Sequence, residues 1–141
     1  MRSYVDTSVL VSALTKETRT ADVQAWMARQ NPGDLAISSW VMTEFSAALS
    51  LKIRSGQLRL EHRAAALSAF SRITAESFHV LAVSDRHYQV AARFADQAPL
   101  GVRAGDALHL AIAFEAGLSI ATLDRKLVEA GSALGVPMEL L

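Results

Sequence analysis

Short apolar runs alternate with longer segments of helical periodicity along the 141-residue chain. Apolar runs of this length are typical of strands in a parallel sheet, whose two faces are both covered by helices. The alternation of the two segment types indicates the same architecture. We therefore predict an α/β fold with three α/β/α layers, built on a short parallel sheet of four to five strands.

The predicted elements follow from the apolar periodicity and its stop signals. Strands are expected at residues 3–6, 35–38, 79–83 and 118–122, with 136–141 as a candidate fifth strand at an edge. Helices are expected at 9–14, 21–30, 39–54, 61–75, 85–98, 104–116 and 125–130. Gly56, Gly117 and Gly131 follow three of these helices, and glycine readily adopts the positive φ that ends a helix. No repeat or linker divides the sequence, so residues 1–141 are expected to form one domain.

The composition excludes several kinds of site. Without cysteine, the chain has no disulfide, zinc–thiolate or iron–sulfur site and no thiol nucleophile. Its 14 basic and 14 acidic residues balance, so nucleic-acid binding would depend on local patches rather than on a net positive field. No apolar segment reaches the length of about 20 residues that spans a bilayer, and no signal peptide is present. A cytoplasmic protein without a membrane partner is expected.

Two aspartates lie at the same predicted edge of the sheet. Asp6 ends the first strand, and Asp124 comes two residues after Thr122 at the end of the fourth. Open parallel sheets bind ligands beyond the carboxyl ends of their strands. For either aspartate alone, however, helix N-capping is the simpler interpretation.

Two further acidic residues lie in apolar helices. Glu44 shares a helix face with Trp40 and Ala48, so its carboxylate needs either a basic partner such as arginine or a metal ion. Asp106 begins the very apolar helix 104–116, where N-capping and a functional role are equally reasonable. If the acidic residues converge on one pocket, their oxygen ligands favour Mg²⁺ or Mn²⁺.

Four motifs spread over most of the chain make the prediction specific. They are Tyr4-Val-Asp-Thr-Ser-Val9, Ser38-Ser-Trp-Val-Met-Thr-Glu-Phe45, Arg103-Ala-Gly-Asp-Ala-Leu-His-Leu-Ala-Ile-Ala113 and Ala121-Thr-Leu-Asp-Arg-Lys126. With these motifs the chain resembles PIN-domain ribonucleases, and most closely the VapC-type toxins of type II toxin–antitoxin systems. The resemblance implies an acidic quartet of Asp6, Glu44, Asp106 and Asp124. Asp6 and Asp106 would be the principal metal ligands, and Glu44 and Asp124 would complete the site directly or through water.

The resemblance also implies a reaction and its partners. The reaction is Mg²⁺-dependent hydrolysis of an RNA phosphodiester by water, which leaves 5′-phosphate and 3′-hydroxyl ends. The implied partners are the RNA substrate, a cognate antitoxin protein and a second copy of the chain in a homodimer. Ser8 and Thr122 are candidates for holding water or phosphate beside the metal, whereas Thr7 is expected to make turn hydrogen bonds.

Other polar residues receive weaker interpretations. His109 lies one helical turn after Asp106 and either orients it or is a hydrogen-bonded core histidine, which is the interpretation we favour. The remaining histidines lack the spacing of a ligand set: His62, His79 and His87. A basic run around residues 52–63 either contacts phosphates or, as we favour, faces solvent: Lys52, Arg54, Arg59 and Arg63.

Two alternative functions fit the same α/β pattern. A non-catalytic PIN-like module for RNA binding or protein interaction has no need for four converging carboxylates. A phosphoacceptor receiver domain would need paired acids after its first strand, and Asp6-Thr7-Ser8 does not supply the pair. If the quartet forms one site, ten acidic residues remain against 14 basic ones, so the rest of the protein carries a net charge of +4.

Overall fold

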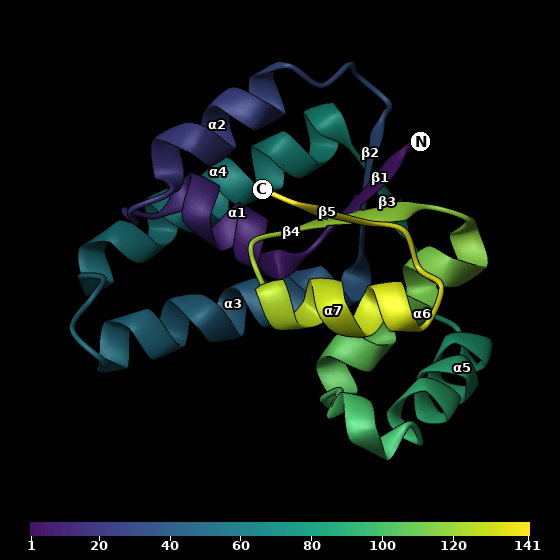
Figure 1. Ribbon diagram of the computed structural model, residues 1–141. Helices are drawn as coiled ribbons and strands as arrows, with labels where there is room; N and C mark the ends of the chain where they lie inside the picture. The colour runs from purple at the N-terminus through teal and green to yellow at the C-terminus, as the bar shows by residue number, and fades with distance from the viewer.

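The computed structural model describes residues 1–141 and contains a five-stranded sheet with helices on both faces (Figure 1). The strands are β1 (Ser3–Val5), β2 (Leu35–Ser38), β3 (Phe78–Leu81), β4 (Ser119–Thr122) and β5 (Met138–Leu140). The helices are α1 (Thr7–Leu14), α2 (Thr20–Ala28), α3 (Ser39–Arg54), α4 (Arg63–Ser77), α5 (Asp85–Ala95), α6 (Ala104–Ala116) and α7 (Arg125–Ala133). The predicted α/β/α fold class is confirmed. None of the helices is both long and apolar enough to cross a membrane.

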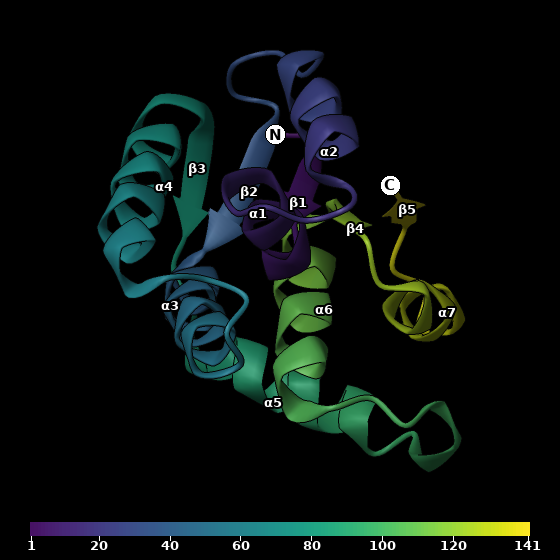
Figure 2. The same cartoon turned by 90° about the vertical axis from the view of Figure 1, so that its left-hand side faces the viewer.

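Every strand pairing in the sheet is parallel, in the order β3-β2-β1-β4-β5 (Figure 2). The chain builds outward from β1 to β3 and then crosses back to β4 on the other side of β1. Val5 pairs with Ala121, and the Asp6 amide donates a hydrogen bond of 3.0 Å to the Ala121 carbonyl oxygen. The ends of β1 and β4 therefore form a topological switch point, which is where open α/β sheets bind ligands.

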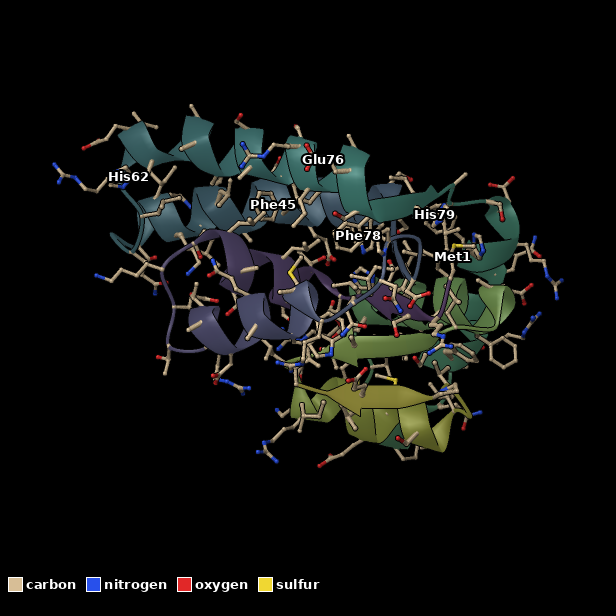
Figure 3. All side chains as sticks on the ribbon, turned by 90° about the horizontal axis from the view of Figure 1, so that it is seen from above. Met1, Phe45, His62, Glu76, Phe78 and His79 are labelled. Atoms are coloured by element: carbon tan, nitrogen blue, oxygen red, sulfur yellow. The ribbon has the colours of Figure 1, made fainter.

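Helix α6 contributes more residues to the hydrophobic core than any other element, and the central strands lie beside it. Figure 1 shows α1, α2 and α4 together on one side of the sheet, with α5 and α6 below it on the other side. All seven residues from Ala107 to Ala113 of α6 are buried, as its apolar composition predicts. On α3, Phe45 is fully buried (Figure 3) and stacks on Phe70 of α4, with 4.4 Å between the ring centroids. This stacking holds α3 against α4.

Four predicted helix ends differ from the structure. The helices predicted at 21–30 and 61–75 end at Ala28 and Ser77, and two others differ by three residues. The helix predicted at 125–130 continues through Gly131 to Ala133, because Gly131 is a close-contact position and not a stop. A β-carbon there would lie 2.9 Å from Leu110 Cδ2 and would also overlap Met138. The helix predicted at 85–98 ends at Ala95, because Gln97 leaves helical geometry with ψ at 73° and a separate 3-10 turn follows at Ala98–Leu100.

Candidate metal centre

Asp6 is the first residue after β1, and it is 6% exposed. It occupies the N-cap position of α1, but its side chain does not cap the helix, so the simple capping interpretation is wrong for this residue. Asp6 Oδ2 instead accepts hydrogen bonds from Ser8 Oγ at 2.7 Å and Thr122 Oγ1 at 2.9 Å. The two hydroxyls predicted to lie beside a metal therefore hold the Asp6 carboxylate at the switch point.

Glu44 projects from α3 toward the same point, with its side chain 27% exposed. Its Oε1 accepts a hydrogen bond of 2.7 Å from Thr7 Oγ1 and a close one from His109 Nε2. The basic partner of Glu44 is thus a histidine and not an arginine, and Thr7 is a contact of the site and not merely a turn residue. Asp6, Glu44 and His109 each offer one potential ligand atom, and these atoms all lie within 4.8 Å of one another.

His109 is fully buried, and both of its ring nitrogens have partners. Its Nδ1 lies 2.7 Å from Tyr4 Oη, and its Nε2 lies 3.6 Å from Asp6 Oδ1. The favoured interpretation as a hydrogen-bonded core histidine is therefore confirmed, but the hydrogen-bonded carboxylate is Glu44 and not Asp106. Sequence reasoning missed Tyr4, whose position in the first strand signals only burial.

Asp106 and Asp124 line a separate cleft of about 570 Å³. Asp106 is the third residue of α6, is partly buried, and makes no hydrogen bond or ion pair. Asp124 does cap α7, because its Oδ1 accepts hydrogen bonds from the amides of Lys126 at 2.9 Å and Leu127 at 3.3 Å. The structure thus divides the predicted quartet into buried Asp6 with half-buried Glu44, and two aspartates on a cleft wall.

The two groups of carboxylates still interact electrostatically. Burial raises the pKa of Asp106, and the negative charges of Asp6, Asp124 and Glu44 raise this pKa further, against the opposing effect of His109. A partly buried carboxylate that is repelled by three others and accepts no hydrogen bond lacks a positive partner. The observation indicates a place for a cation.

Glu44 and His109 stabilise each other's charged forms. Burial alone would raise the pKa of Glu44, but the hydrogen bond and charge of His109, with the Thr7 hydroxyl, bring this pKa below its ordinary value. Burial alone would lower the pKa of His109, but its hydrogen bond to Glu44 and the charge of Asp6 raise it. Burial raises the pKa of Tyr4, so its phenol keeps its proton. The imidazole and carboxylate are therefore held as a charge-assisted pair.

The carboxylate oxygens suit a hard divalent cation such as Mg²⁺ or Mn²⁺. Asp6 and Glu44 lie together at the switch point, and Asp106 and Asp124 line a cleft near enough for the charges of Asp6 and Glu44 to act on Asp106. Each of the four carboxylates keeps an oxygen without a hydrogen bond: Asp6 Oδ1, Glu44 Oε2, Asp124 Oδ2 and both oxygens of Asp106. The donor set therefore fits a metal of this class.

Two basic side chains, Arg103 and Lys126, line the same cleft as Asp106 and Asp124. Neither forms an ion pair, although acidic residues surround them. Figure 2 shows the segment between α5 and α6, which contains Arg103, below α7, which carries Lys126. Sequence reasoning missed both residues, although they flank the aspartates within the recognised motifs.

The basic run at residues 52–63 and the histidines without ligand spacing lie outside the cleft of Asp106 and Asp124. Lys52 is buried and pairs with Glu17 at 3.0 Å, so for this residue the prediction of a solvent-facing basic run is wrong. None of the residues of that run lines the 570 Å³ cleft. His62 and His79 lie at opposite ends of the molecule (Figure 3), which agrees with their lack of ligand spacing.

The sequence model of the PIN domain matches residues 3–132, which is most of the chain. The chain belongs to the PIN-domain family. No curated protein sequence matches it significantly.

Solved structures similar to this PIN domain include three that align over nearly their whole length. PAE2754 from Pyrobaculum aerophilum is 25% identical with a TM-score of 0.71, covering 98% of this chain and 90% of its own. VapC20 from Mycobacterium tuberculosis, described as a sarcin–ricin loop cleaving toxin, is 20% identical with a TM-score of 0.71, covering 92% and 95%. VapBC2 from Rickettsia felis, bound to a DNA fragment from its promoter, is 15% identical with a TM-score of 0.71, covering 100% and 99%.

Proposed function

We propose that this PIN domain is a Mg²⁺-dependent endoribonuclease, and that it is the toxin of a type II toxin–antitoxin pair. One observation carries the proposal: the unpartnered Asp106 carboxylate faces the charges of Asp6, Glu44 and Asp124 at the switch point of the sheet. Retaining four carboxylates together without a counter-charge costs stability. A site that binds a metal ion accounts for this cost, and a simple scaffold does not.

The proposed roles follow from the surroundings of each carboxylate. Asp6, fixed by Ser8 and Thr122, and Asp106 would be the principal metal ligands, with Glu44 and Asp124 completing the site. When bound, Mg²⁺ would stabilise charge on phosphoryl oxygens and make water more acidic. The protein's own contribution is to hold its carboxylates at one end of the sheet and to leave them open to a cleft.

The cleft supports a phosphodiester substrate. Arg103 and Lys126 bring unpaired positive charge beside the carboxylates, where a nucleic-acid backbone would otherwise be repelled. The similarity to VapC20, described as a sarcin–ricin loop cleaving toxin, favours RNA as the substrate class. Attack by water, and not by the ribose 2′-hydroxyl, would give 5′-phosphate and 3′-hydroxyl ends.

Protein partners are part of the same proposal. The similarity to VapBC2 favours a cognate antitoxin that binds this chain. We also propose a homodimer, because an apolar groove of about 330 Å³ lies open among α3, α5 and α6. Eight of its nine lining residues are hydrophobic, Trp40 and Tyr88 among them, which is typical of a surface that contacts protein.

Mapping of RNA 5′ ends after brief expression tests the function. Wild-type protein should arrest growth and create new 5′-phosphate ends, whereas Asp6→Asn and Asp106→Asn should do neither. Asp22→Asn is the matched control, because Asp22 is an exposed aspartate on α2 with 69% of its side chain accessible. Undiminished toxicity of both site variants, or 2′,3′-cyclic phosphate products, would contradict the proposal.

A further inference from the structure

A continuous chain of hydrogen bonds runs from the interior of the sheet to Glu44. Ser38 Oγ, at the end of β2, lies 2.7 Å from Tyr4 Oη of β1. The same phenol oxygen lies 2.7 Å from Nδ1 of His109, whose Nε2 contacts Glu44 Oε1. Ser38, Tyr4 and His109 are each 0% exposed, so water does not compete for these bonds.

The Glu44 carboxylate at the end of these hydrogen bonds determines which nitrogen of His109 carries a proton. An ionised Glu44 carboxylate can only accept, so Nε2 of His109 carries a proton whether the imidazole is neutral or charged. In the neutral ring, Nδ1 accepts from the Tyr4 hydroxyl, which accepts from Ser38. In the charged ring these two bonds reverse direction, and the hydroxyls still satisfy one another. The N–H toward Glu44 is therefore present in both states.

The same N–H lies between two carboxylates from different elements. Glu44 comes from α3 and Asp6 follows β1, and Asp6 Oδ1 is 3.6 Å from His109 Nε2. The two negative charges would otherwise repel and turn apart. The imidazole cannot follow such a movement, because Tyr4 holds its far side and its ring packs 5.6 Å from the Tyr4 ring.

We propose that His109, oriented by Tyr4 and Ser38, is a positioning residue that holds Glu44 and Asp6 in the arrangement that binds a divalent cation. The inference rests on the proposed nuclease function and adds a residue that the acidic quartet does not include. His109 is not itself a ligand, because a nitrogen that donates its proton to Glu44 has no free lone pair for a metal. Groups that support metal ligands in this way typically change metal affinity by about 10–100-fold.

The test measures binding of Mg²⁺ and of Mn²⁺ to the full chain by calorimetry, without RNA, together with the unfolding temperature in EDTA. His109→Gln keeps an N–H near the position of Nε2, whereas His109→Asn keeps a polar group only near Nδ1. Tyr4→Phe removes the hydroxyl that orients the imidazole. His62→Asn is the matched control, because His62 is an exposed histidine that lies outside the hydrogen-bond chain.

We expect His109→Asn to bind Mg²⁺ about 10–100-fold more weakly than wild type. His109→Gln should retain more affinity than His109→Asn, Tyr4→Phe should lose affinity, and His62→Asn should match wild type. Mg²⁺ and Mn²⁺ affinities should fall by the same factor. If His109→Asn does not fold, the comparison of Tyr4→Phe with wild type decides the question.

Two outcomes would overturn the role of His109 while leaving the nuclease proposal standing. The first is wild-type Mg²⁺ affinity in the His109 and Tyr4 variants with only a lower unfolding temperature, which would make the chain of bonds structural. The second is a much larger loss of Mn²⁺ than of Mg²⁺ affinity, which would make the imidazole a metal ligand. If wild-type protein bound neither metal, both the inference and the proposed function would fail.

Discussion

Replacing Asp106 with asparagine should stabilise the metal-free protein and, at the same time, abolish its response to Mg²⁺. Asparagine keeps the shape of the side chain and removes one negative charge. Asp106 accepts no hydrogen bond that the variant would lose, and it is repelled by Asp6, Asp124 and Glu44. The same substitution removes a proposed principal ligand, so its two effects have opposite signs.

The expected gain in stability can be bounded from the burial of the residue. Two unit charges about 4 Å apart interact by about 4 kcal/mol at an effective dielectric constant of about 20, and exposed pairs by about 1 kcal/mol or less. Asp106 is only partly buried, and His109 offsets part of the repulsion, so the lower value applies. A gain of about 1 kcal/mol corresponds to a rise of roughly 3–5 °C in Tm for a domain of this size.

The pH dependence has a definite sign. Because the pKa of Asp106 is raised in the folded state, its protonated form stabilises the fold at low pH. That stability is lost as the pH rises through the raised pKa. Asp106→Asn should not show this loss of stability as the pH rises. The variant should therefore be more stable than metal-free wild type at neutral pH, and the difference should vanish below the ordinary carboxyl pKa range.

Thermal unfolding followed by circular dichroism, in EDTA and then in excess Mg²⁺, provides the assay. A ligand at about 100 times its Kd stabilises the folded state by about 2.7 kcal/mol, so wild type should overtake Asp106→Asn once Mg²⁺ is added. Asp22→Asn should follow wild type under both conditions. The reasoning would be refuted if Asp106→Asn melted below wild type in EDTA, or if Mg²⁺ raised the Tm of both proteins equally.

Packing, substrate charge and self-association allow further tests. Gly131→Ala should lower the free energy of unfolding by up to about 2 kcal/mol in urea titrations, because the added methyl overlaps Leu110 at a cost of about 1–3 kcal/mol, which the helix-propensity gain of about 1 kcal/mol offsets only in part. A more stable variant would contradict the packing argument. The double variant Arg103→Gln with Lys126→Gln should raise KM for RNA and reduce the slope of log affinity against log salt by about 0.7 per lost contact, without changing Mg²⁺ affinity. An unchanged salt slope would show that these side chains do not contact phosphate. Ala92→Glu, in the apolar groove, should convert a dimer to a monomer in light scattering, and a variant that stayed dimeric would exclude that surface.

Much of the fold could be predicted because its signals are local. The strand at 35–38 and the helices at 39–54 and 104–116 have the predicted bounds in the structure. Gly56 and Gly117 adopt the positive φ expected of helix ends, at 76° and 68°. Gly131 did not follow the same rule. A glycine is needed there because any side chain would overlap Leu110 and Met138, which come from other elements.

The candidate site was predicted less completely. Strand polarity and residue type were enough to bring Asp6 and Asp124 to one sheet edge. They did not indicate that Asp124 caps a helix while Asp6 does not, since capping depends on which donors each carboxylate meets. The burial of Lys52 was also missed, because its partner Glu17 comes from a distant loop.

Local pattern thus established the parallel α/β class and the sheet edge that carries Asp6 and Asp124. Periodicity, strand ends and side-chain chemistry are properties of neighbouring residues, so they can be read along the chain. The hydrogen-bond chain behind Glu44 is not such a property, because it joins Tyr4 to Ser38 and to His109 across 34 and 105 sequence positions. Only the packing of β1, β2 and α6 around the switch point brings these atoms within 2.7 Å, and this packing places a histidine N–H between two carboxylates.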